Sequence, residues 1–176
     1  EDEGIWAVVD EGANSNTHSD FWMKDAEKKW AKLGFSPYLK DATTTTFSGV
    51  GSKASSGKYK LPCGLRLEES QLLLPGCVDS HEMPNSHHPL LFSQSCQAKL
   101  GFKKDVRDGT ITMKDYDDQN LEVARQIRTG LFMIRIDHLD QQMFAEGPPN
   151  IAKMLVHPPS LVPPGQEDEA DQVRSP

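Results

Sequence analysis

Apolar and polar positions along the chain predict a mainly β structure. Between Lys58 and Leu67, apolar residues alternate with polar ones, which is typical of a strand with one buried face. The segment Gln71 to Val78 predicts a second strand that pairs with the first. Further strands are indicated by apolar runs at Ile5 to Val9, Leu90 to Phe92, Leu121 to Ala124 and Leu131 to Ile136.

Helical signals occur at two places only. Ser19 and Asp20 are suitable N-terminal caps for a helix from about Phe21 to Leu33, which Gly34 ends. A second, shorter helix is expected from about Ser93 to Leu100, before Gly101. The apolar face expected for the first helix consists of Phe21, Trp22, Ala26, Trp30 and Leu33.

Turn signals separate the remaining strands. A β-branched run at Thr43 to Phe47 predicts a strand, and the glycines that follow it predict an exposed tip. Asp108-Gly109 predicts a two-residue hairpin turn between β-prone neighbours. The polar segment Asp79 to His88, with its proline, predicts a loop.

Composition narrows the classes of protein that fit the 176 residues. The net charge of −7 and the lack of a basic stripe argue against direct nucleic-acid binding by this segment. No apolar run is long enough to predict a membrane span. Three widely spaced cysteines fit no disulfide framework and favour an intracellular location, cytoplasmic or nuclear. We expect one folded domain over residues 1–139 and a proline-rich acidic linker without fixed structure over 140–176.

The main chemical candidate is the turn Asp10-Glu11-Gly12-Ala13, which directly follows an apolar strand. This position brings the Asp10 carboxylate to the mouth of a buried strand. Gly12 allows the backbone to approach and hydrogen-bond to that carboxylate, and Ala13 leaves room beside it. The pattern is typical of the start of an aspartic protease active site.

With these elements in order, the chain resembles the retropepsin-like protease segment of retrotransposon Gag-Pol polyproteins. The resemblance covers about Ile5 to Leu139, and it depends on the acid turn, on the glycine-bearing segment Phe47 to Gly51, and on Pro89 to Ser93 before a short helix. Two positions depart from the family pattern. Glu11 stands where the family has Thr or Ser, and Ser93 stands where it usually has Gly.

The resemblance implies a retropepsin-like fold, which is a closed β-barrel subunit with one or two short helices. It also implies an aspartic endopeptidase that needs no cofactor and acts as a homodimer on extended peptide or polyprotein substrates. Asp10 from each copy would form the acid pair, because one carboxylate is not enough for this reaction. Gly49, Val50 and Gly51 would belong to a flap over the substrate.

Two other functions remain open at this stage. Glu11 would place a second charge beside the acid pair, unless a lysine or an amide bonds to it or its side chain turns outward. The same fold could therefore be an inactive dimerisation or peptide-binding module. A zinc-stabilised interaction domain is the other alternative, suggested by Cys77 and His81 with His87, His88 and Cys96 nearby, although their spacing matches no compact zinc motif.

Overall fold

The computed structural model describes residues 3–41, 46–47 and 53–140. The glycine-rich residues Gly49, Val50 and Gly51 and the expected linker after Asp140 lie outside the described residues. The expectations for those segments are therefore not addressed by the structure.

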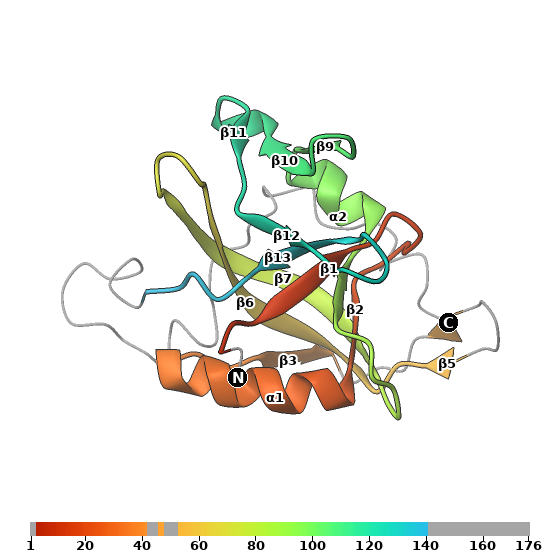
Figure 1. Cartoon of the computed structure of the whole chain (residues 1–176). Coiled ribbons are helices and arrows are strands. Elements are labelled where there is room, and N and C mark those ends of the chain that lie inside the picture. The colour runs from red at the N-terminus through yellow and green to blue at the C-terminus, as the bar shows by residue number, and fades with distance from the viewer. Residues whose placement is uncertain (1–2, 42–45, 48–52, 141–176) are drawn as a thin grey trace.

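An eight-stranded mixed sheet dominates the described part of the chain and confirms the mainly β class (Figure 1). Two neighbouring pairs, β1 with β8 and β2 with β7, are parallel, and the others are antiparallel. From edge to edge the strands are β12 (Val123–Arg125), β13 (Phe132–Arg135), β1 (Trp6–Val9), β8 (Leu90–Phe92), β2 (Thr17–Ser19), β7 (Leu73–Met83), β6 (Gly57–Arg66) and β3 (Tyr38–Asp41).

The hairpin of β6 and β7 contains the two longest strands of this sheet. Its register runs from Gly57 opposite Glu82 to Arg66 opposite Leu73, which confirms the predicted pairing. The inward positions of β6, Leu61, Cys63 and Leu65, are fully buried, as the alternation predicts. The predicted loop from Asp79 is wrong at its start, because β7 continues to Met83 by pairing in parallel with β2.

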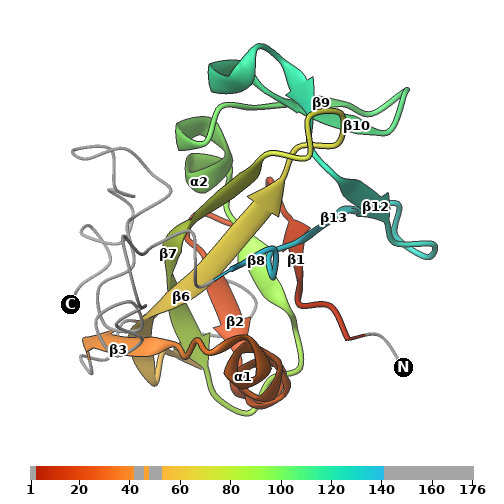
Figure 2. The same ribbon diagram turned by 90° about the vertical axis from the view of Figure 1, so that its left-hand side faces the viewer.

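Helix α1 (Asp20–Leu33) has the ends that the sequence predicts. Ser19 accepts a hydrogen bond from the backbone N–H of Trp22 at 3.0 Å, and Gly34 ends the helix in the left-handed conformation. The predicted apolar face is wrong at one position, since Phe21 is 61% exposed and Met23 is buried instead. Helix α1 lies at one end of the molecule, and α2 (Gln94–Lys99) lies toward the other end (Figures 1 and 2).

A three-stranded antiparallel sheet lies beyond α2. It contains β9 (Phe102–Asp105), β10 (Thr110–Met113) and β11 (Gln119–Asn120), with a 3-10 turn, η1 (Lys114–Tyr116), between the last two. The predicted hairpin is confirmed, but its two-residue turn is wrong. Asp105 pairs with Thr110, and the side chain of Asp105 accepts the N–H of Asp108, so four residues form the connection.

A separate two-stranded ribbon is formed by β4 (Thr46–Phe47) and β5 (Lys53–Ala54). The two strands are antiparallel, with Thr46 opposite Ala54 and Phe47 opposite Lys53. They flank in sequence the segment that the resemblance assigns to a flap.

The expected closed barrel is not present in the described residues, because the large sheet is open and has β3 and β12 as its edges. It is nevertheless strongly curled. The chain beyond β13 crosses β6, where the N–H of Gly64 donates to the carbonyl of Ile136 at 2.7 Å and His138 donates to the carbonyl of Gly64 at 3.2 Å. Gly64 permits this crossing, since a Cβ there would lie 2.0 Å from the His138 carbonyl oxygen. Isolated bridges of Gly64 with Asp137 and of Leu67 with Leu121 thus connect β6 and the residue after it to the segments next to β13 and β12 without closing a barrel.

The core lies inside the curled sheet and under α1. Its largest fully buried side chains include Trp30, Phe35 and Phe92, and one hydrophobic cluster connects them to the strands. Within the part of the chain that is described, no helix is long and apolar enough to cross a bilayer.

Candidate active-site turn

The backbone of Asp10 is fixed by the strand next to it. Strands β1 and β8 lie side by side in parallel, with Val9 opposite Phe92 (Figure 2). The N–H of Asp10 then donates to the carbonyl of Phe92 at 3.0 Å, which extends the pairing by one bond into the turn. Asp10 is therefore carried to the end of a buried strand pair while its own side chain is only half-buried.

The Asp10 carboxylate is hydrogen-bonded by its own turn. The N–H of Gly12 donates to Asp10 Oδ1 at 2.8 Å, as expected from the sequence. A Cβ at Gly12 would lie 3.2 Å from the same oxygen, which is a tight contact. The N–H of Ala13 donates to the carbonyl of Asp10 at 3.3 Å and closes the turn. Glycine at position 12 is therefore what allows the close approach of the backbone to the acid.

Helix α2 and strand β7 hold the turn from behind. The carbonyl of Ala13 accepts the N–H of Gln94, in the first turn of α2, at 3.2 Å. Asn16 is buried and bridges two elements: its Oδ1 accepts the N–H of Ser93 at 2.8 Å, and its Nδ2 donates to the carbonyl of Asp79 at 3.0 Å. The acid turn is thus attached to three elements that are distant in sequence.

Glu11 turns outward, away from the core. Its side chain is 63% exposed, and its carboxylate contacts the ammonium group of Lys104 on β9. The charge that would be costly beneath an acid pair is therefore placed at the surface and bound to a lysine. An outward-turned Glu11 and a lysine bonded to it were both among the arrangements that the sequence left open, but the sequence did not predict which lysine.

The described residues contain one acid turn at the end of an apolar strand. The Asp-Gly step Asp108-Gly109 lies in the connection between β9 and β10 and does not follow an apolar strand. A single copy of the chain thus presents one candidate catalytic carboxylate, and a two-acid mechanism would require a second copy.

The residues of the zinc hypothesis do not gather into a site. Cys77 and Cys96 are buried in the interior, whereas His87 is exposed. Among the residues for which the structure gives positions, no group of three or more histidine, cysteine or acidic side chains is arranged to hold a metal ion.

A buried polar cluster around His18 was not predicted. His18 Nδ1 lies 2.7 Å from Ser80 Oγ, and its Nε2 lies 3.4 Å from Glu82 Oε2. The order of groups is that of a hydrolytic triad, but His18 and Ser80 are fully buried, so no substrate can reach them. Burial lowers the pKa of His18 below its ordinary value, against the opposing effect of Glu82. This cluster connects β2 to β7 and is structural.

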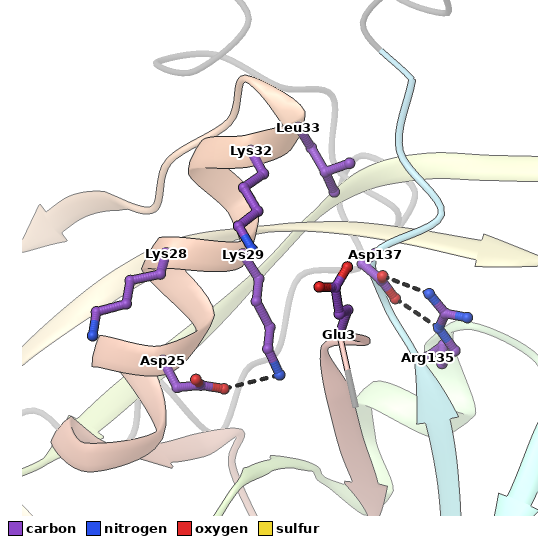
Figure 3. A pocket seen from close by; sticks show the side chains of 8 residues that line it. All are labelled: Glu3, Asp25, Lys28, Lys29, Lys32, Leu33, Arg135 and Asp137. Atoms are coloured by element: carbon purple, nitrogen blue, oxygen red, sulfur yellow. Dashed lines mark hydrogen bonds and ion pairs between the residues drawn. The ribbon is translucent and has the colours of Figure 1, made fainter. Parts of the chain in front are cut away.

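A charged hollow of about 400 Å³ lies between α1 and the end of β13 (Figure 3). Four of its charged groups form two pairs, since Arg135 binds Asp137 with two hydrogen bonds and Lys29 pairs with Asp25 at 2.9 Å. Asp10 is not part of its lining. The hollow therefore does not belong to the acid turn.

Comparisons of the chain with protein-family models, with curated proteins and with solved structures found no match. Assignment of a function must therefore start from the geometry of the turn and from the order of the elements around it.

Proposed function

We propose that this chain is one subunit of a homodimeric aspartic endopeptidase, a retropepsin-like domain of a retroelement polyprotein, in which Asp10 of each copy supplies half of the acid pair. The observation that carries the proposal is the environment of Asp10. Its backbone is anchored to Phe92, its carboxylate accepts the N–H of Gly12, and its side chain still reaches solvent. A carboxylate that is fixed but accessible is what water activation requires.

The order of the elements supports the same proposal. The chain passes from the buried strand β1 to the acid turn, then through β2, α1 and β3 to the β4–β5 ribbon, the long β6–β7 hairpin, the buried strand β8 and the short helix α2. This is the order on which the resemblance to retropepsin-like domains depends. The parallel pairing of β1 with β8 brings the two ends of that series together behind the acid.

The proposed chemistry uses two Asp10 side chains that share one proton. The ionised carboxylate takes a proton from a trapped water, and the water oxygen attacks the carbonyl carbon of the peptide. The protonated carboxyl of the second copy gives its proton to the carbonyl oxygen. When the tetrahedral intermediate collapses, the C–N bond breaks, the leaving nitrogen takes the proton that the first carboxylate received from water, and a hydroxyl group of the intermediate returns its proton to the second carboxylate. The substrate would be an extended peptide, covered by the segment that contains Gly49, Val50 and Gly51.

The test compares Asp10→Asn with Asp108→Asn, which removes an exposed carboxylate in the connection between β9 and β10. Both proteins are assayed with a library of extended, mostly apolar peptides between acid and neutral pH, with and without a pepstatin-like inhibitor. We expect Asp10→Asn to lose about 10²- to 10⁴-fold in activity, because it removes the acid–base group, and Asp108→Asn to be unchanged.

Subunit mixing tests the shared site directly. Wild type that has exchanged subunits with an equal amount of Asp10→Asn protein should retain about half of its original activity, since random pairing reduces dimers with two acids from about half to about a quarter of all dimers. Activity that falls only in proportion to dilution would contradict a site built from two copies.

A second candidate function is favoured by Glu11, which replaces the family's Thr or Ser beside the acid. In this case the domain would be a dimerisation or peptide-binding module without activity. Wild-type dimers that cleave no peptide at any pH, yet bind extended peptides or remain dimeric, would support this function and contradict the endopeptidase.

A further inference from the structure

The ion pair between Glu11 and Lys104 connects the acid turn to a strand more than ninety residues later in the sequence. The two partners are in unlike environments, because the side chain of Lys104 is only 15% exposed whereas that of Glu11 is 63% exposed. A lysine with so little exposure needs an anionic partner to offset its loss of hydration. Glu11 is thus the partner that satisfies Lys104.

A second cation lies close to Lys104. The Lys104 ammonium is 5.9 Å from the centre of the Phe132 ring, and the Arg125 guanidinium is 4.8 Å from the same centre. The hydrogen bonds of Arg125 go to the carbonyl groups of Gly130 and Val106. Lys104 on β9 and Arg125 on β12 are therefore gathered around one aromatic ring, with the Glu11 carboxylate beside Lys104.

The carboxylates of Asp10 and Glu11 are held by different groups. Asp10 accepts the N–H of Gly12 within the turn, whereas Glu11 contacts Lys104 on the neighbouring sheet. Asp10 and Glu11 are consecutive, so their Cα atoms are about 3.8 Å apart. This separation is within the screening length of about 8 Å at physiological salt, so an uncompensated charge on Glu11 would act on Asp10.

We propose that Lys104 is a positioning residue for Asp10: by pairing with Glu11 it keeps that carboxylate away from the acid and cancels its charge there. The effect of this pair on catalysis rests on the proposed function, whereas its effect on the charge near Asp10 does not. The pairing explains how an acid turn tolerates Glu where a neutral hydroxyl residue is usual. Glu11 and Lys104 together replace that neutral residue with a pair that has no net charge.

The proposal predicts opposite effects from the two halves of the pair. In Lys104→Met, the negative charge of Glu11 is uncompensated and favours the proton-bound acid pair, so the pH–activity profile moves to higher pH. In Glu11→Gln, the Lys104 cation is uncompensated and favours the ionised form, so the profile moves to lower pH. Each shift should be about half a pH unit, and the double variant should return close to wild type.

The matched control is Lys103→Met, which removes the same formal charge from the same strand. Lys103 is 60% exposed and pairs with Asp118 at 3.3 Å rather than with Glu11. Its pH–activity profile should coincide with that of wild type. A purely structural role for Lys104 would lower activity at all pH values, without the reversed shift in Glu11→Gln or its cancellation in the double variant.

A second measurement separates this inference from the proposed function. The side-chain carbon signal of Asp10, assigned by its loss in Asp10→Asn, is followed by NMR against pH in the same four proteins and the control. Opposite displacements of its midpoint support the pair even if no peptide is cleaved. If cleavage depends on Asp10 but neither single variant moves the profile or the NMR midpoint, the positioning role is overturned and the proposed function stands.

Discussion

Asn16 and Ser93 lie 77 positions apart in the chain, yet Asn16 Oδ1 accepts the backbone N–H of Ser93 at 2.8 Å in the interior. The other end of the same amide donates to the carbonyl of Asp79 at 3.0 Å. One side chain therefore fixes the acid turn to the start of α2 and to β7. The contact with Ser93 is buried and the contact with Asp79 is partly buried, so water is poorly placed to replace the amide at Ser93.

Asn16→Ala should destabilise the fold by about 1–3 kcal/mol, because it leaves the buried N–H of Ser93 and the partly buried carbonyl of Asp79 without their partner. Asn14→Ala is the matched control, since Asn14 is exposed in the same loop and its loss should change stability by less than about 0.5 kcal/mol. Denaturant unfolding of the three proteins measures the difference. Equal stabilities for Asn16→Ala and Asn14→Ala would show that the bridge is not important.

Gly64→Ala should be the most damaging small substitution in the sheet. Its Cβ would lie 2.0 Å from the His138 carbonyl oxygen, and backbone cannot move aside as a flexible side chain can. We expect a loss of more than about 4 kcal/mol or failure to fold. Gly130→Ala is the control: Gly130 has a positive φ of 69° with nothing within 4 Å of the added Cβ, so its cost should be only about 1–2 kcal/mol. Similar thermal midpoints for the two variants would contradict the crossing at Gly64.

Local chemistry explains which parts of the fold are visible in the sequence. Both ends of α1 were predictable, because Ser19 and Gly34 bond to backbone groups within one helical turn of themselves. The long hairpin of β6 and β7 was predictable because its alternation directly reflects one buried face. Phe21 was misplaced because it lies at the exposed start of α1, where its ring packs 4.8 Å from that of His87.

Contacts between distant segments explain what the sequence did not reveal. β7 extends to Met83 because it pairs with β6 as far as Glu82 and with β2 as far as Met83, and no local pattern at Asp79 to His88 signals the β2 partner. The connection between β9 and β10 was predicted to have two residues but has four. The Asp105 side chain accepts the N–H of Asp108 and stabilises this longer connection. At the candidate site, the acid and its glycine followed from local pattern, whereas Lys104 and Asn16 depend on tertiary structure.

The three cysteines should be inert in the native protein. Cys63, Cys77 and Cys96 are all buried and form no disulfide, and burial raises the pKa of the Cys63 thiol well above its ordinary value. A thiol that is neither exposed nor ionised reacts only when the structure opens. At pH 8, an aromatic disulfide reagent should react slowly with the folded chain. After denaturation it should react rapidly with all three cysteines and release three equivalents of aromatic thiol per chain. Rapid labelling of one thiol without denaturant would contradict the buried arrangement.

The His18 cluster should make stability depend on pH below neutrality. Burial lowers the pKa of His18 below 6.5, so the unfolded chain binds more protons than the folded one in acid. Stability is therefore fully present above pH 6.5 and is lost as the pH falls below it, by up to about 1.4 kcal/mol per pH unit until His18 itself titrates. The charged groups that face His18 are Glu82, His81 and Asp20, of which Glu82 opposes the shift most.

Chemical denaturation of wild type, His18→Asn and His87→Asn between pH 5 and pH 8 isolates this effect. Asparagine at position 18 keeps a polar atom near Ser80 but cannot titrate, so His18→Asn should lose less stability on acidification than wild type. His87 is exposed, and His87→Asn should retain the wild-type dependence. Asp20 does not interfere, because the N–H of Asn85 lowers its pKa below 3.8 and its contribution is lost only in stronger acid. An unchanged slope in His18→Asn would mean that the acid sensitivity of the fold arises from other groups.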